Sequence, residues 1–495
     1  MVELEEILIL SGRKAMSLKS LIRFKELPLE VKVSTAYAIC SIIQNCIQFV
    51  TLPIFTRLLT QEQFGQYTIY SSWSSIFVIF ITLNLAYGSF STAMVKFEDK
   101  RDQYITSVQA ICLLLAGIFM LLYLPFRRYW NVLLELPTEM ICLMVMEILA
   151  NLAILLWSGK KRFEFKYVSV VLVTLLNAVV GPLAAYILVM NTEEKGYARI
   201  IGYAGVTVLV GGFIFILNAI KGGNPFKKEF WRYALGFNIP LIAYYLSQVV
   251  FNQSDRIMIS HIQGKDKAAV YGVAYTLSVV LTFVLNAINN SYVPWFYNKI
   301  KENEKKTNRP VANSLSVLMA VLLSGVIWLA PEIIWIVAGK AYAEAVWVVP
   351  PVALSVLLLF YSQMFVNVEF YYEEKKKLVF VSAGAALLNI VLNAVFIPVF
   401  GYYAAGYTTL ISYIVFTLGN YFGMKAVLQE NNQDNDAFDT RGMILIFLAF
   451  MLVAFLGMAL YRFLWIRILI MSVVVIFLLV FRTKLMELVQ KLRQQ

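Results

Sequence analysis

Long apolar stretches alternate with short polar loops along most of this chain. A hydrocarbon core about 30 Å thick requires roughly 20 apolar residues of helix to cross it. Because lipid offers no partner for backbone N–H and C=O groups, such stretches predict helices. We therefore expect an all-α polytopic membrane protein with about 14 transmembrane helices. The expected spans are residues 34–55, 67–93, 104–124, 139–157, 167–190, 199–220, 233–260, 269–293, 311–330, 346–370, 378–400, 402–424, 442–462 and 466–481.

The distribution of positive charge predicts the orientation of these spans. Of the 42 Lys and Arg residues, 31 lie in the N-terminal segment, the loops after even-numbered spans and the C-terminal tail. The positive-inside rule then places both termini in the cytoplasm and the protein in a cytoplasmic membrane. The basic loops are expected to contact anionic lipid headgroups. No loop is long enough for a soluble basic domain, so the net charge of +12 does not indicate nucleic-acid binding.

The residues required for most enzyme chemistry are missing from the sequence. There is a single histidine, His261, so neither a histidine metal cluster nor a Ser-His triad is expected. No GxxxxGK[ST] phosphate loop is present, and we expect no catalytic residue, metal site or cofactor. No signal peptide is recognisable, and Met16 is a second candidate start. Transport is therefore favoured over catalysis.

Two parts of the chain follow the same plan. LPIFTRLLTQEQFGQYTIY at 52–70 parallels FNQSDRIMISHIQGKDKAAVYGVAYTL at 251–277, with Arg57 matching Arg256 and Gly65 matching Gly272. Parallel repeats predict two bundles with a cavity between them. The expected segments are a cytoplasmic N-terminal segment (1–32), an N-terminal six-helix bundle (33–224), a C-terminal six-helix bundle (225–428), a cytoplasmic linker (429–441), helices 13 and 14 (442–482) and a cytoplasmic tail (483–495).

Several spans carry polar residues, and each costs a few kcal/mol in lipid unless it faces protein or water. Glu147 and Asp255 are the carboxylates that we expect to couple an ion. Simple hydrogen bonds between helices, and a local ion pair of Asp255 with Arg256, are the alternatives. Pro240 predicts a bend in span seven. The amides expected to line a cavity are Asn45, Gln48, Asn252, Asn286 and Asn290.

Three motifs carry a resemblance to a known family. Arg57, Gly65 and Tyr67 follow span one, Asp255-Arg256 lies near the end of span seven, and GKAYAEAVWVVPPVALS occupies 339–355. From about residue 32 to 481 the chain resembles Wzx-type polysaccharide flippases of the multidrug/oligosaccharidyl-lipid/polysaccharide exporter superfamily. The resemblance implies a V-shaped, MATE-like arrangement of the two bundles.

The resemblance also implies a function. Such flippases move undecaprenyl-diphosphate-linked oligosaccharide repeat units from the inner to the outer leaflet of a bacterial membrane by alternating access, for surface polysaccharide biosynthesis. Arg57 and Arg256 would bind the diphosphate by charge-assisted hydrogen bonds, and the amides would bind the sugars. An H⁺ or Na⁺ counter-ion would supply energy through Glu147 or Asp255. Contact with a polysaccharide polymerase and glycosyltransferases is expected.

Three other functions are consistent with the same pattern. A lipid-linked peptidoglycan precursor flippase would favour several cations deep in the first half, which are not obvious here. An ion-coupled drug or metabolite antiporter would have twelve spans. A membrane polymerase or ligase would be expected to carry a large outer loop, whereas the longest outer connections are about fifteen residues.

Overall fold

The protein is built from helices, as the apolar pattern predicts. The computed structural model describes residues 29–302, 304–372, 376–433, 437–470 and 472. Among these residues there is no β-strand, and twelve helices are long and apolar enough to cross a membrane. This confirms the all-α polytopic class. Outside the described residues lie residues 1–28 with Met16, most of the expected span 466–481, and the tail 483–495.

The helices follow the expected spans closely, with one additional feature: several spans are divided into two helices. They are α3 (Leu29–Leu58), α4 (Gln61–Thr82), α5 (Phe90–Lys96), α6 (Arg101–Tyr123), α7 (Arg127–Leu134), α8 (Thr138–Phe163), α9 (Tyr167–Met190), α10 (Lys195–Gly222), α11 (Lys228–Asn238), α12 (Ile242–Gln263), α13 (Lys265–Ser278), α14 (Thr282–Lys301), α15 (Asn308–Trp328), α16 (Ala330–Ala338), α17 (Val349–Tyr371), α18 (Lys376–Phe400), α19 (Tyr403–Glu430) and α20 (Thr440–Ala459).

The start of α4 shows how local sequence sets these boundaries. The Thr60 hydroxyl accepts a bond from the Gln63 backbone N–H at 3.2 Å, and the Gln63 side chain accepts from the Thr60 N–H at 3.1 Å. This capping box satisfies two donors that a new helix leaves unpaired. It separates α4 from α3 after a turn of only two residues.

Span seven consists of α11 and α12, joined by a 3₁₀ turn at Ile239–Leu241. Pro240 lies in this turn, where its missing N–H and fixed φ interrupt the α-helix. The helix α11 packs against the first half of the protein: Phe230 contacts Phe97 with ring centroids 4.9 Å apart, and Asn238 donates to Ser89 at 2.8 Å. The helix α12 packs against α18 in the second half and also against α4. Span seven therefore links the two halves.

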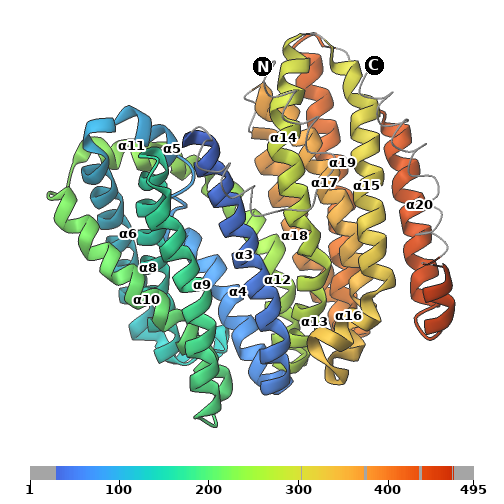
Figure 1. The fold of residues 1–495 in the computed structure, drawn as a ribbon, viewed down its shortest axis with the longest axis horizontal. Coiled ribbons are helices and arrows are strands. Elements are labelled where there is room, and N and C mark those ends of the chain that lie inside the picture. The colour runs from blue at the N-terminus through green and yellow to red at the C-terminus, as the bar shows by residue number, and fades with distance from the viewer. Residues whose placement is uncertain (1–28, 303, 373–375, 434–436, 471, 473–495) are drawn as a thin grey trace, which may run out of the picture.

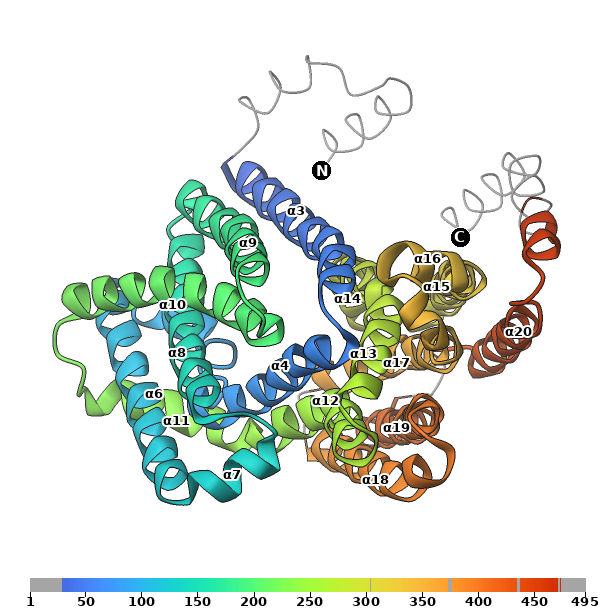
Figure 2. The ribbon, with the colours of Figure 1, turned by 90° about the horizontal axis from the view of Figure 1, so that it is seen from below.

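Two groups of helices, α3–α11 and α12–α20, converge toward α13 and α16 and splay apart toward α11 and α14 (Figure 1). At the convergent end, Thr56 donates to the Val337 carbonyl at 2.8 Å and Arg57 donates to the Ile336 carbonyl at 2.9 Å. Seen along the bundle, α4, α12 and α13 occupy the centre (Figure 2). Because the convergent end is the predicted outer end, the structure is closed on that side.

The central crossing of α4 and α13 requires glycine at position 65. A Cβ atom there would lie 2.1 Å from the Lys265 carbonyl oxygen, so the two helices pack backbone to backbone. Gly65→Ala should push them apart and lower the free energy of unfolding by roughly 1–3 kcal/mol, as overpacking does. Thermal unfolding in detergent would measure this. Gly117→Ala is the control, because nothing lies within 4 Å of its added methyl; equal melting temperatures of the two variants would contradict the close packing.

Candidate functional site

Asp255 lies at the centre of a buried polar cluster in the second half. Its side chain is 1% exposed. Tyr271 donates to Oδ2 at 2.5 Å, Thr409 donates to Oδ2 at 2.7 Å, and Asn393 donates to Oδ1 at 2.6 Å. These four residues, which we call the Asp255 cluster, come from α12, α13, α18 and α19. Three helices thus supply hydroxyl and amide donors to one carboxylate on a fourth.

A second layer of polar side chains holds this cluster in place. Asn389 lies four residues before Asn393, so both project from the same face of α18. The Asn389 amide donates to Thr409 at 3.2 Å and its oxygen accepts from Ser254 at 2.9 Å. Thr408 donates to the Asn393 oxygen. The region therefore contains several side-chain oxygens near one acid, and oxygen is the ligand type that hard cations prefer.

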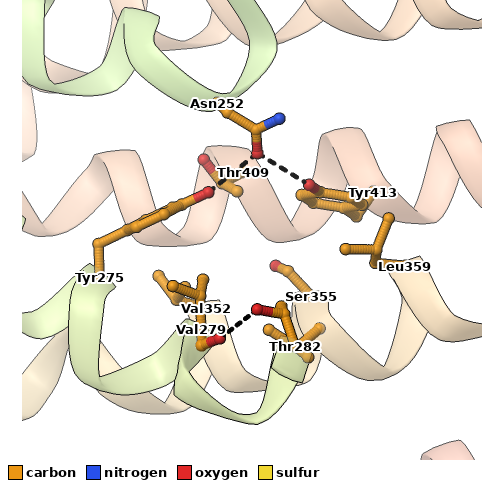
Figure 3. Close-up of a pocket in the computed structure, with 10 residues that line it drawn as sticks. Asn252, Tyr275, Val279, Thr282, Val352, Ser355, Leu359, Thr409 and Tyr413 are labelled. Atoms are coloured by element: carbon orange, nitrogen blue, oxygen red, sulfur yellow. Dashed lines mark hydrogen bonds between the residues drawn. The ribbon is translucent and has the colours of Figure 1, made fainter. Parts of the chain in front are cut away.

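A cavity of about 270 Å³ adjoins the Asp255 cluster and shares Thr409 with it. Asn252 projects into this cavity and accepts bonds from Tyr275 at 3.0 Å and Tyr413 at 3.4 Å (Figure 3). The remaining wall is largely apolar, from residues such as Val352 and Leu359. The sequence predicted Asn252 as a cavity residue, and the structure places it beside Asp255.

Arg256 does not pair with its neighbour Asp255. Its guanidinium lies 4.4 Å from the centroid of the Tyr275 ring and donates to Gln253 at 2.6 Å. Among the described residues, the Asp255 carboxylate accepts bonds from neutral groups alone. An acid buried without a cation costs several kcal/mol, so its retention favours a functional role over a structural one.

Glu147 lies in a separate cavity of about 210 Å³ in the first half. Its Oε2 accepts a bond from the Tyr70 hydroxyl at 2.7 Å, which joins α8 to α4. Ser71, Ser74 and Thr207 also line the cavity, so its wall is rich in hydroxyl groups. The two predicted ion-coupling acids thus occupy different halves.

A buried cation that was not predicted from the sequence lies in the first half. Arg199 is 5% exposed, and its guanidinium carbon lies 3.8 Å from the Tyr67 ring centroid, with Phe55 and Phe64 also within 4.6 Å. Its Nε and Nη1 atoms have no hydrogen-bond partner among the described residues. The signal was present in the sequence: an arginine near the start of an apolar span, in GYARIIGYAG at 196–205.

The other predicted binding residues are not gathered at either cavity. Arg57 is exposed and bonds the Ile336 carbonyl at the outer contact. Gln48 is exposed on α3 and Asn45 is half-buried. Asn286 and Asn290 are exposed on α14, and neither lines the cavity beside Asp255.

At the predicted cytoplasmic end, one acid pairs with three lysines. Burial raises the pKa of Glu164, but hydrogen bonds from Lys161, Lys166 and Lys160 outweigh it and lower the pKa to about 2. A depressed pKa stabilises the fold above the ordinary value of 4.5, and this contribution is lost as the pH falls toward 2.

The melting temperature of the detergent-solubilised protein should therefore fall between pH 4.5 and 2, and less steeply for Glu164→Gln. Differential scanning fluorimetry across this range would measure the difference. Parallel pH profiles for the two proteins would contradict the assignment.

The fold agrees with a comparison to known families. A family model described as "Polysaccharide biosynthesis protein" matches residues 31–300, more than half of the chain. The chain belongs to this family. A protein of Haemophilus influenzae called "Lsg locus putative protein 1" is 23% identical over 366 residues, covering 70% of this chain and 86% of that protein.

Solved structures with the same fold come from the multidrug/oligosaccharidyl-lipid/polysaccharide superfamily. The inward closed conformation of the lipid II flippase MurJ aligns with a TM-score of 0.62 at 16% identity, covering 90% of this chain and all of that one. An inward-facing multidrug resistance MATE transporter aligns with a TM-score of 0.57 at 13% identity, covering 80% of this chain and 99% of that one. The predicted all-α, MATE-like fold is thus confirmed for this member of the polysaccharide biosynthesis protein family.

Proposed function

We propose that this protein moves undecaprenyl-diphosphate-linked oligosaccharide repeat units from the inner to the outer leaflet of a bacterial cytoplasmic membrane by alternating access. The observation that carries the proposal is that the two halves meet at one end of the molecule and separate at the other (Figure 1). Thr56 and Arg57 of α3 bond α16 at the predicted outer end, whereas the opposite ends splay apart. Such an arrangement would admit a lipid-linked headgroup from the cytoplasm and release it once the outer contact separates.

The distribution of charges suggests how the cargo is held. Arg256, against the cavity wall, and the buried Arg199 place one cation in each half. Either guanidinium would bind a diphosphate oxygen through charge-assisted hydrogen bonds. Asn252 and the nearby tyrosine hydroxyls would bind sugar hydroxyls, while the isoprenoid tail remains in lipid. Arg57, at the outer contact, would meet the diphosphate only on release.

Energy would come from an ion bound at the Asp255 cluster. Its carboxylate accepts bonds from two hydroxyl groups and one amide, and within the described part of the chain it forms no ion pair. H⁺ or Na⁺ entering there would neutralise the acid and change the packing of α12 against α18 and α19. Because α12 continues from α11, which packs on the first half, such a change would be transmitted to the other bundle.

Reconstituted transport tests this proposal directly. Proteoliposomes would contain a fluorescent undecaprenyl-diphosphate oligosaccharide, and dithionite quenching would report its transfer between leaflets under an imposed H⁺ or Na⁺ gradient. We expect transfer of this lipid and little transfer of a lipid-linked peptidoglycan precursor. Transfer of the precursor alone would replace the proposed cargo, and efflux of small cationic drugs alone would replace the flippase assignment by antiport.

Glu147→Gln should reduce transfer about tenfold while leaving the amount of protein in the membrane unchanged. The amide still accepts the Tyr70 hydroxyl bond, so the contact between α8 and α4 is kept. The substitution removes the negative charge of Glu147, and a hydrogen bond to a charged group contributes about 1.5–3 kcal/mol. Polymer output in cells and transfer in proteoliposomes would measure the loss. Normal output from the variant would remove Glu147 from the mechanism.

A further inference from the structure

The largest of the three cavities described lies away from both acidic sites, at the predicted cytoplasmic end of the first half. Its volume is about 610 Å³, and it is formed where α5 meets α11. We call it the α5–α11 pocket. Its lining residues are Lys96, Phe97, Lys228, Glu229, Arg232 and Tyr233.

The pocket has a surplus of positive charge. Lys96, Lys228 and Arg232 oppose the single acid Glu229. None of the three cations forms an ion pair with a carboxylate in the part of the chain that the structure describes. Unpaired cations that converge from two helices attract an anion, because cations gathered in a recess concentrate the electrostatic field there.

Several neighbouring cations at the same end are neutralised by acids. Lys160 contacts Asp102 at 2.6 Å, Lys166 contacts Glu164 at 3.2 Å, and Arg101 contacts Glu98 at 3.2 Å. Lys100 and Lys221 at this end are likewise outside any ion pair among the described residues, but neither lines the α5–α11 pocket, which brings three such cations together.

The floor of the pocket is aromatic and closely packed. Phe97 is buried and contacts Tyr104, Phe230 and Tyr233 at centroid distances of 5.7, 4.9 and 5.4 Å. Lys96 lies 4.7 Å from the Tyr233 ring centroid, which holds its ammonium group over the recess. Cations around an aromatic floor suit a phosphate attached to an apolar or sugar group better than a bare inorganic ion.

We propose that the α5–α11 pocket binds the phosphate group of a membrane lipid at the cytoplasmic surface. This inference rests on the proposed function. In that function, the pocket collects the lipid-linked diphosphate before the lipid enters the space between the halves. The headgroup of an anionic phospholipid carries the same phosphate group and could also occupy the pocket. The helix α11 continues through Ile239–Leu241 into α12, which carries Asp255. An occupied pocket would hold α11, the first part of this segment, against α5.

Binding measurements on the full-length protein in nanodiscs test this site. The probes are geranylgeranyl diphosphate in neutral-lipid nanodiscs and phosphatidylglycerol incorporated in place of neutral lipid. Lys228→Gln and Arg232→Gln should each weaken binding of the phosphate lipid about tenfold, since a charge-assisted hydrogen bond contributes about 1.5–3 kcal/mol. The matched control is Lys166→Gln, which removes the same charge from a paired lysine at the same end; it should change the affinity less than twofold.

The results separate the two sources and the two proposals. If the pocket variants bind geranylgeranyl diphosphate more weakly in neutral nanodiscs, the ligand is the lipid-linked diphosphate of the cargo. If they lose only phosphatidylglycerol binding, the ligand is an anionic phospholipid headgroup. Either result supports the site. Equal losses in Lys166→Gln and the pocket variants, or no loss at all, overturn it. Thermal unfolding confirms that each variant is folded. Pocket binding in a protein that transfers no cargo would refute the proposed function alone, whereas normal transfer with unaltered binding in the pocket variants would refute this site alone.

Discussion

Asp255→Asn should abolish the response of transport to an ion gradient while leaving the protein folded. The amide has the same shape and can still accept a bond from Tyr271 or Thr409. It no longer supplies the negative charge that would neutralise a bound cation or carry a proton. Loss of a charge-assisted interaction of about 1.5–3 kcal/mol corresponds to roughly a 10- to 100-fold weaker ion site.

The measurement is the rate of lipid transfer in proteoliposomes with and without an imposed H⁺ or Na⁺ gradient. Asp99→Asn serves as the matched control, because this aspartate is exposed at the predicted cytoplasmic end. Thr409→Val, which removes one donor but keeps the acid, should give a smaller loss. A gradient response in Asp255→Asn equal to that of the unmodified protein would exclude the Asp255 cluster from coupling.

Cross-linking Thr56→Cys to Val337→Cys, in a background with the four native cysteines replaced, should stop transfer almost completely. The Thr56 hydroxyl lies 2.8 Å from the Val337 carbonyl oxygen, so the pair joins α3 to α16 across the outer contact. A covalent bond there would hold the outer end closed, and alternating access requires it to open. Reduction of the cross-link should restore transfer.

A second cysteine pair within one half provides the control for this experiment. The Thr106 hydroxyl also lies 2.8 Å from a carbonyl oxygen, that of Asn218, but it joins α6 to α10 inside the first bundle. Cross-linking Thr106→Cys to Asn218→Cys should leave transfer largely intact, because these helices are expected to move together. Continued transfer by the protein locked between Thr56 and Val337 would refute separation of the outer ends.

Local sequence was sufficient to predict most helices. The expected span 167–190 coincides with α9 (Tyr167–Met190), and Pro240 marks the turn that divides span seven. The division of span eight at Val279–Leu281 carries no such signal, since three apolar residues are compatible with an uninterrupted helix. Breaks caused by packing, rather than by proline, are invisible to local rules.

The candidate sites were only partly predictable. Asp255 was recognised because an acid in an apolar span is costly, but its partners Asn393 and Thr409 lie 138 and 154 residues away. Arg57 was assigned to the cargo, yet in the structure its guanidinium bonds the Ile336 carbonyl at the outer contact. A side chain's type can be read from sequence, whereas its partner depends on how distant helices are rotated.

The sequence by itself determined that this protein is a multi-pass membrane protein, and it predicted an orientation and a repeated plan. Those properties depend on the length of apolar runs and on the charges between them, which are local. The tertiary structure decided which polar groups meet, which end of the two halves is closed, and where unpaired cations collect. In lipid, both the buried and the outward faces of a helix are apolar, so periodicity does not reveal its rotation. Only the packing of α4, α12 and α13 against each other sets those contacts.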